Sequence, residues 1–208
     1  MAPKDNVAIV ALLKVKHTGI PLIIANPHLT WDPYFKDVKL IQAALLMQEL
    51  EDFRLQFPTL ASIVGFVPSS RTPAIPTIIC GDFNSLPDSG VYAFLSAGSL
   101  AKNHPDFGPY KYPPFTNEGL AHPFDIVSTY SLIGEPPFTN HTPGFHGTID
   151  YLWHTSSSLR PTAVLSPLTK EFADTAYGFP NPHFPSDHIS LGAQYRLILP
   201  FQRRNQRA

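Results

Sequence analysis

Side chains that could hold a metal ion or move a proton occur in four short clusters of this 208-residue chain, each beside an apolar run. The clusters are Asn26 with His28, Asp82 with Asn84, Asp150, and Asp187 with His188. Alternate side chains of a strand share one face, so Asp82 and Asn84 can point the same way from a strand end. Catalytic groups are commonly carried on loops that a sheet holds in place. We therefore expect these clusters to supply one site.

These residue types match the needs of phosphodiester hydrolysis. That reaction requires a hard cation on oxygen ligands, a group that orients the attacking water, and donors for charge developing on the phosphoryl group. The Asp82 carboxylate and Asn84 amide, with the imidazoles of His28 and His188, would supply these parts. The sequence has no Gly-rich phosphate loop with Lys, no Cys/His spacing for zinc and no Gly-x-Ser-x-Gly elbow. Further histidines lack ligand spacing and are expected to be loop residues without a metal: His104, His122, His141, His146 and His183.

Motifs that recur in the same order give a specific resemblance. Gly81–Ser85, Ile149–Tyr151 and Ser186–His188 resemble the last motifs of the endonuclease/exonuclease/phosphatase superfamily. The longer stretches Ala25–Pro33, Ile79–Tyr92 and Pro180–His188 resemble the carbon catabolite repressor type of poly(A) deadenylase, and the likeness runs from about Lys4 to Leu197. It implies an α/β fold: part of a two-layer β-sandwich flanked by helices (deoxyribonuclease I-like), with residues 1–208 as the C-terminal portion of that domain and its N-terminal portion missing.

The resemblance also implies catalytic roles. Asp82 would activate or orient the attacking water and help to hold the metal, and Asn84 would position the water and the scissile phosphate. His188 would stabilise the phosphoryl transition state, with Asp150 and Asp187 arranging it and the surroundings of the metal. The implied metal is Mg²⁺, with Asp82 and Asp187 as its ligands in this chain.

A second set of residues matches the family positions that hold the substrate. His28 would hydrogen-bond a phosphate oxygen, while Pro33, Asn140 and Phe145 fall where these deadenylases hold the terminal adenosine, with the Phe ring under the base. Stacking of a base on an aromatic ring is tolerant of sequence, so adenine preference also needs contacts to the base edge. Asn140 is the candidate for that contact. The implied reaction is 3′→5′ removal of poly(A) from mRNA with release of AMP.

The chain departs from the family pattern at two places. Asn26-Pro27-His28 stands where the family usually has Asn-Thr-His, and proline removes a backbone donor, so we expect an altered strand end at His28. The family's principal magnesium ligand, a Glu in its first half, has no counterpart in this chain. We therefore expect weak or no magnesium-dependent hydrolysis by these 208 residues alone.

Hydrophobic periodicity predicts the elements that position these residues. Val7–Val15 and Leu22–Ala25 are expected to be antiparallel strands, because both are apolar and a short polar connection separates them. From about Phe35 to Phe57 the pattern predicts a long amphipathic helix, whose broad apolar face includes Leu45 and Met47.

The rest of the chain predicts shorter elements. Pro58–Pro76 is expected to be a surface loop, Thr77–Cys80 a buried strand, and Ser89–Gly98 a helix that Gly ends. Asn103–Gly147 shows little periodicity and is expected to be a long loop region. Three further strands are expected at Thr148–Trp153, Ala163–Leu165 and Ile189–Leu199. Strands, a long helix and catalytic loops together indicate an α/β domain with mixed, largely antiparallel sheets.

Composition limits the class of protein and its partners. Apolar residues make up 43% and charged residues 15%, and the net charge is −1, so any RNA contact must be local. The single cysteine, Cys80, suits a reducing compartment, and the start Met1–Asn6 has no secretory leader. We expect a cytoplasmic and nuclear protein that binds poly(A) RNA and scaffold subunits of a deadenylase complex, without membrane or DNA partners.

Two alternative functions stay open from the sequence. The chain could be a catalytically inactive interaction module that keeps part of the fold without its metal chemistry. It could also be a related phosphodiesterase or phosphatase that acts on a small nucleotide. Only the residues Pro33, Asn140 and Phe145 favour a deadenylase over an enzyme that acts on a small nucleotide.

Overall fold

A mixed five-stranded sheet forms the centre of the computed structural model, which describes residues 5–198 except 57–74, 174, 176 and 183. The order of its strands is β1-β2-β3-β9-β6. Their bounds are Ala8–Lys14 for β1, Pro21–Pro27 for β2, Thr77–Asp82 for β3, Asp150–Thr155 for β9 and Ile126–Ser128 for β6. Neighbouring strands are antiparallel except for the parallel pair β2 and β3. The sheet is therefore mixed and largely antiparallel, as the sequence predicted.

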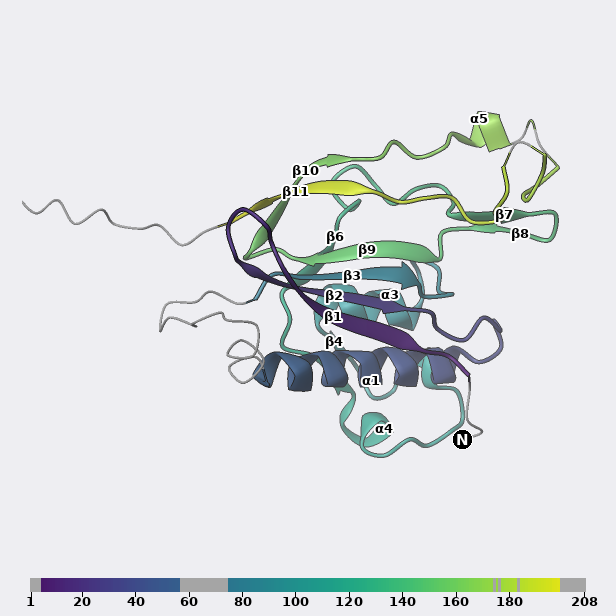
Figure 1. Cartoon of the computed structure of the whole chain (residues 1–208). Coiled ribbons are helices and arrows are strands. Elements are labelled where there is room, and N and C mark those ends of the chain that lie inside the picture. Colours follow the sequence, from purple (N-terminus) through teal and green to yellow (C-terminus); the bar gives the residue numbers. More distant parts are fainter. Residues whose placement is uncertain (1–4, 57–74, 174, 176, 183, 199–208) are drawn as a thin grey trace, which may run out of the picture.

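Two helices cover one face of this sheet. Helix α1 (Lys36–Leu55) lies along it and helix α3 (Gly90–Ala97) packs beside α1 (Figure 1). Their apolar side chains join those of the strands in a single buried cluster that contains Leu40, Ile79 and Trp153. This burial explains the helical pattern of α1, since a surface helix places its apolar stripe against the core.

A second, smaller layer lies on the other side of the sheet. Strands β10 (Leu159–Val164) and β11 (Ala193–Leu197) form an antiparallel pair. The hydroxyl of Tyr195 on β11 lies 2.6 Å from Thr129 Oγ1, next to β6, and its ring packs on His154 of β9. Figure 1 shows this pair above the central sheet, while α1 runs below it. The described residues thus form part of a two-layer β arrangement flanked by helices.

Several short elements complete the described chain. They are β4 (Ser99–Leu100), the 3-10 turn η1 (Pro105–Phe107), α4 (Phe115–Glu118), β5 (Leu120–Ala121), β7 (Asn140–Thr142), β8 (Phe145–Gly147) and α5 (Lys170–Ala173). Strands β7 and β8 pair as a hairpin at the same end of the molecule as the last residues of β3 (Figure 1). No helix within the described ranges is long and apolar enough to cross a membrane.

Local sequence signals predicted several elements well. The antiparallel pair β1–β2, the helix α1 and the strand β3 occur where expected. Helix α3 begins after Ser89, whose hydroxyl accepts the Tyr92 amide, and ends at Gly98 in the left-handed conformation with φ 74°.

Three predictions about elements need correction. Leu45 was placed on the apolar face of α1, yet it is 45% exposed, because the helix presents it to a groove beside β1 and not to the sheet. The region Asn103–Gly147 is not one long loop, since it contributes the edge strand β6 and the β7–β8 hairpin. The final strand is shorter than predicted, Ala193–Leu197. The predicted loop at Pro58–Pro76 falls almost entirely outside the described residues.

Candidate active site

The sheet brings three of the predicted polar residues to one edge. Parallel strands β2 and β3 end at the same edge, where His28 bridges to Asp82. Strand β9 is antiparallel to β3, so it begins at that edge, and its Asp150 is paired with Asp82. His188 reaches the same place from the C-terminal part of the chain, because its backbone bridges to Asn140 of the β7–β8 hairpin. Strand direction therefore assembles residues that lie up to 160 positions apart.

Two carboxylates and one imidazole form the centre of the site. His188 Nδ1 lies 2.8 Å from Asp150 Oδ2, and His188 Nε2 lies 4.0 Å from Asp82 Oδ2. One ligand atom from each of these three residues lies within 4.8 Å of the others, which makes them the group suited to hold a metal ion among the described residues. His28 Nε2 adds a second imidazole at 3.4 Å from Asp82 Oδ2. The arrangement can hold a divalent cation on Asp82 and Asp150, since Mg²⁺ is commonly bound by one or two carboxylates and water.

Electrostatics tune these groups for proton transfer. Burial, and secondly the neighbouring Asp150 carboxylate, raise the pKa of Asp82 to about 6. The hydrogen bond to Asp150 raises the pKa of His188, against the smaller effect of burial. A base works best when its pKa lies near the working pH, so Asp82 is suited to accept a proton from water. His188 is correspondingly held as a donor toward Asp82 and the open cleft.

A tight turn fixes Asn84 beside Asp82. Asn84 has φ 47°, a left-handed conformation that Asn tolerates better than most residues. Its backbone amide donates to Asp82 Oδ1 at 2.8 Å, and its side-chain amide donates to the Leu29 carbonyl at 2.9 Å and to Asp82 Oδ2 at 3.2 Å. These bonds give Asn84 one orientation and hold the Asp82 carboxylate in place.

Lysine 39 is a site residue that the sequence did not reveal. Lys39 lies on the first turns of α1, is only 6% exposed, and its Nζ donates to the Asn84 carbonyl at 2.7 Å. Burial lowers its pKa, while the nearby Asp32 acts in the opposite direction. Lys39 therefore ties the helix to the Asp82–Asn84 turn. Its position among apolar residues of a helix gives no sequence signal for this contact.

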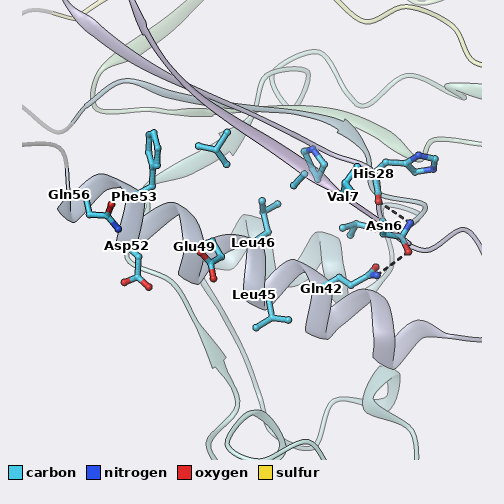
Figure 2. Close-up of a pocket in the computed structure, with 14 residues that line it drawn as sticks. Asn6, Val7, His28, Gln42, Leu45, Leu46, Glu49, Asp52, Phe53 and Gln56 are labelled. Atoms are coloured by element: carbon cyan, nitrogen blue, oxygen red, sulfur yellow. Dashed lines mark hydrogen bonds between the residues drawn. The ribbon is translucent and has the colours of Figure 1, made fainter. Parts of the chain in front are cut away.

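The strand end at His28 is less altered than Pro27 suggested. Strand β2 continues through Pro27, which pairs with Ala8 of β1, and His28 still bridges to Asp82. The Asn6 side chain donates to the His28 carbonyl at 3.0 Å, and Gln42 of α1 in turn donates to Asn6 at 3.1 Å (Figure 2). These two side-chain hydrogen bonds hold the strand end at His28, although Pro27 has no backbone donor.

A cleft of about 690 Å³ contains nearly all predicted site residues. Those lining it are His28, Pro33, Asp82, Asn84, Asn140, Phe145, Asp187 and His188. Asp150 is not among the lining residues, but its carboxylate lies 2.8 Å from Nδ1 of His188, which is one of them. The cleft also takes in residues not predicted from the sequence, among them Trp31, Lys36 and Lys39. Asp88 and Asp106 lie in the same wall. A smaller cavity of about 480 Å³ lies elsewhere, between β1 and α1 (Figure 2).

The β7–β8 hairpin carries the residues predicted to hold a base. Asn140 is 6% exposed and its amide donates to Asp187 Oδ2 at 3.2 Å, while the ring of Phe145 is 41% exposed in the cleft. Asp187 was predicted as a metal ligand with Asp82. In the structure its carboxylate accepts a hydrogen bond from Asn140, while among the described residues the group whose ligand atoms lie close enough to share a metal ion is Asp82, Asp150 and His188. The role of Asp187 as a metal ligand stays a prediction.

Comparison with known proteins agrees with this geometry. The model of the endonuclease/exonuclease/phosphatase family matches residues 20–188. The CCR4-Not complex 3′-5′-exoribonuclease subunit Ccr4 of Mycosarcoma maydis is 45% identical over 201 residues, which are 93% of this chain and 30% of that protein. The subunit of the same name from Schizosaccharomyces pombe is 43% identical over 204 residues, covering 93% and 29%. The chain thus spans about 30% of the length of these relatives.

Solved structures show the same fold. The crystal structure of ANGEL2, a 2′,3′-cyclic phosphatase, in complex with adenosine-2′,3′-vanadate has a TM-score of 0.74 and 28% identity, covering 94% of this chain and 62% of that one. The catalytic domain of human Nocturnin with bound sulfate has a TM-score of 0.58 at 24% identity, covering 94% and 54%. The matched range contains all four polar clusters and ends on His188. This chain belongs to the endonuclease/exonuclease/phosphatase family.

Proposed function

We propose that this chain carries the phosphodiesterase centre of a Mg²⁺-dependent 3′→5′ exoribonuclease that shortens poly(A) and releases AMP. The observation behind the proposal is one cleft that joins the Asp82–Asp150–His188 cluster to the aromatic ring of Phe145 and the amide of Asn140. Relatives at 40–45% identity are named as 3′-5′-exoribonuclease subunits. Since the chain spans about 30% of their length, the activity is proposed here and not transferred.

The geometry supports a hydrolytic step by these residues. Water oxygen attacks phosphorus while the bond to the 3′ oxygen of the shortened chain breaks, so the released nucleotide keeps its 5′ phosphate. Asp82 is placed to accept the proton of the attacking water, and Asn84 would orient that water beside it. His188, held by Asp150 through Nδ1, keeps Nε2 for a phosphoryl oxygen, and His28 donates to another.

Metal chemistry fits the donors that are present. Asp82 and Asp150 would hold Mg²⁺ through carboxylate oxygens, and the bound ion would supply Lewis-acid stabilisation of the phosphoryl charge. His188 Nδ1 is engaged by Asp150, which leaves the hard oxygen donors for the metal. Asp187 keeps its place as a proposed contributor to the metal surroundings through water, because its carboxylate lies in the same cleft.

Base recognition is assigned to the hairpin side of the cleft. Phe145 would stack under the terminal adenine, and Asn140, oriented by Asp187, would hydrogen-bond its edge. Pro33 lies in the same cleft and would pack on the sugar or base. An Asn amide can accept from adenine N6 and donate to adenine N7, so it offers both contacts that this base edge needs.

The test combines hydrolysis with binding on the 208-residue chain. Oligo(A), oligo(C) and adenosine 2′,3′-cyclic phosphate are incubated with Mg²⁺ or with EDTA, and products are separated by chromatography. We expect AMP release from oligo(A) that requires Mg²⁺ and disappears in Asp82→Asn. Asp52→Asn, an exposed carboxylate on α1 away from the cleft, serves as the matched control.

Each other outcome selects a different function. Faster hydrolysis of the cyclic phosphate than of oligo(A) would favour the phosphatase alternative, which the likeness to the ANGEL2 structure supports. Selective oligo(A) binding without any hydrolysis would favour the interaction module. Metal-independent hydrolysis, or hydrolysis unaffected by Asp82→Asn, would contradict the proposal.

Complex membership and location are also proposed. The relatives are named as subunits of the CCR4-Not complex, so we propose that this chain acts within a deadenylase complex of cytoplasm and nucleus. Co-purification of the tagged chain with scaffold subunits, and imaging of the same tag, would test both statements.

A further inference from the structure

Two exposed side chains of the cleft, one aromatic and one basic, have no role in the proposed reaction. Trp31 follows β2 by four residues and is 74% exposed, yet its ring lines the cleft. Lys36, at the start of α1, lines the same cleft, and its side chain is 64% exposed. No ring contact within the described part of the chain involves Trp31. A large ring left open to water in the same cleft as a lysine is available for a ligand.

The order of the strands separates Trp31 from the hairpin site. Trp31 belongs to the segment between β2 and α1, whereas Phe145 belongs to the β7–β8 hairpin. In the sheet, β3 and β9 lie beyond β2, and they carry Asp82 and Asp150 at their facing ends. Figure 1 shows the segment after β2 and the β7–β8 hairpin projecting on the two sides of these strand ends. The strand ends that carry the carboxylate cluster therefore lie between the two segments to which Trp31 and Phe145 belong.

We propose that Trp31 and Lys36 form a second nucleotide subsite, in which Trp31 stacks the base that precedes the terminal nucleotide and Lys36 contacts its phosphate. This inference rests on the proposed function, because it assumes a single-stranded nucleic acid in the cleft. Proteins that bind single strands combine aromatic stacking with cations along the backbone, and each stacked base adds affinity without requiring one sequence. Strand polarity follows, since the terminal nucleotide occupies the hairpin side and the remaining chain leaves past Trp31.

The charges around Lys36 are compatible with a phosphate. Its Nζ lies 3.8 Å from Asp106 Oδ1, a long ion pair on a largely exposed side chain that contributes little to stability. Asp106 is also fixed elsewhere, because its Oδ2 accepts the Gly90 amide at 2.7 Å. Lys36 can therefore turn toward a phosphate while Asp106 stays in place. Asp88 lies in the same cleft and disfavours a phosphate nearer to its own side.

The chain supplies its own optical probe for this subsite. It has two tryptophans, and the other, Trp153, is 0% exposed in the core. Emission that a nucleic acid can quench therefore comes from Trp31. Phosphorothioate oligo(A), which resists hydrolysis, and AMP are titrated in Mg²⁺ with excitation outside adenine absorption, while polarisation of a labelled oligomer reports binding independently. We expect strong quenching by the oligomer, little by AMP, and none in Trp31→Phe.

Two pairs of variants separate stacking from charge. Trp31→Ala should lower the ratio of oligo(A) affinity to AMP affinity by about fivefold or more, whereas Tyr34→Ala should not, since Tyr34 is 91% exposed and does not line the cleft. Lys36→Gln should reduce the slope of log affinity against log salt by about 0.7, the value for one single-strand phosphate contact. Lys16→Gln, in the exposed turn at the opposite end of β2, should leave that slope unchanged.

The outcomes test the second nucleotide subsite separately from the proposed exoribonuclease activity. Oligo(A) that binds by polarisation without quenching Trp31 would overturn the second subsite alone. Quenching by AMP equal to that by the oligomer would assign Trp31 to the terminal base and would overturn it as well. Absence of any oligomer binding would contradict both the subsite and the proposed exoribonuclease.

Discussion

Replacement of Asp82 by asparagine is expected to raise the free energy of unfolding of the metal-free protein at neutral pH. The same substitution is expected to remove Mg²⁺-dependent hydrolysis. The Asp82 side chain is 16% exposed, and its pKa is raised from the ordinary 3.8 to about 6, first by burial and then by Asp150. A carboxyl whose pKa is raised on folding does not change the free energy of unfolding while it is protonated in both states. Between about pH 4 and about pH 6 the unfolded chain binds fewer protons than the folded one, so the free energy of unfolding falls as the pH rises. Above about pH 6 this loss is constant.

The magnitude follows from the same pKa. The difference between 3.8 and about 6 amounts to roughly 3 kcal/mol at about pH 7.5 and roughly 1 kcal/mol at about pH 4.5. Asparagine keeps an acceptor for the Asn84 backbone amide but faces the Asn84 side-chain donor with its own NH₂, which costs about 1 kcal/mol. We therefore expect Asp82→Asn to raise the free energy of unfolding by about 2 kcal/mol at pH 7.5 and by about zero at pH 4.5.

The assay is urea unfolding followed by circular dichroism, at both pH values and with EDTA. Asp52→Asn, an exposed carboxylate on α1, should change stability by less than about 0.5 kcal/mol at either pH. Added Mg²⁺ should stabilise the wild type and narrow its difference from Asp82→Asn, since a ligand that binds only the folded state stabilises it. A variant that is less stable than the wild type at pH 7.5, or a difference that does not depend on pH, would refute the reasoning.

Three other variants test other contacts. Gly81→Ala should destabilise the protein by more than about 4 kcal/mol in the same urea assay, because a Cβ would lie 2.1 Å from the Pro27 carbonyl oxygen; stability near that of the wild type would mean that β2 and β3 are further apart. Asp150→Asn should lower the pKa of His188, since the Asp150 hydrogen bond is the main cause that raises it, and an NMR titration of the His188 ring checks this; an unchanged pKa would contradict the pairing. Phe145→Ala should weaken oligo(A) and oligo(C) binding alike, by roughly fivefold or more, measured by polarisation, because stacking is tolerant of sequence; a loss confined to oligo(A) would make Phe145 a base-specific contact.

Local signals explain why much of the fold could be predicted from the sequence. The caps of α3 lie within one turn of the helix they end, and the polar connection between β1 and β2 sets a short-range antiparallel pair. The periodicity of α1 is a local property too, although it placed Leu45 on the buried face. The edge strand β6 escaped prediction because three residues give no period, and only the pairing with β9 makes them a strand.

The same division applies to the candidate site. The motifs contain most of the polar residues that line the cleft, because the chemistry of phosphodiester hydrolysis needs those types wherever the chain places them. The motifs do not show which of these side chains contact one another. The Asp150 carboxylate lies 2.8 Å from the His188 imidazole and Asp150 pairs with Asp82, because β9 runs antiparallel to β3 and brings its first residue to the last residue of β3.

The sequence by itself thus determined the family resemblance, the types of catalytic side chain and the elements with local signals. The tertiary structure alone decided that Lys39 reaches the Asn84 carbonyl and that Trp31 and Lys36 share a cleft with Phe145. These contacts join residues far apart in the chain, and their free energy depends on burial and distance, which strand order and helix packing set. No pattern within a few neighbouring residues carries that information.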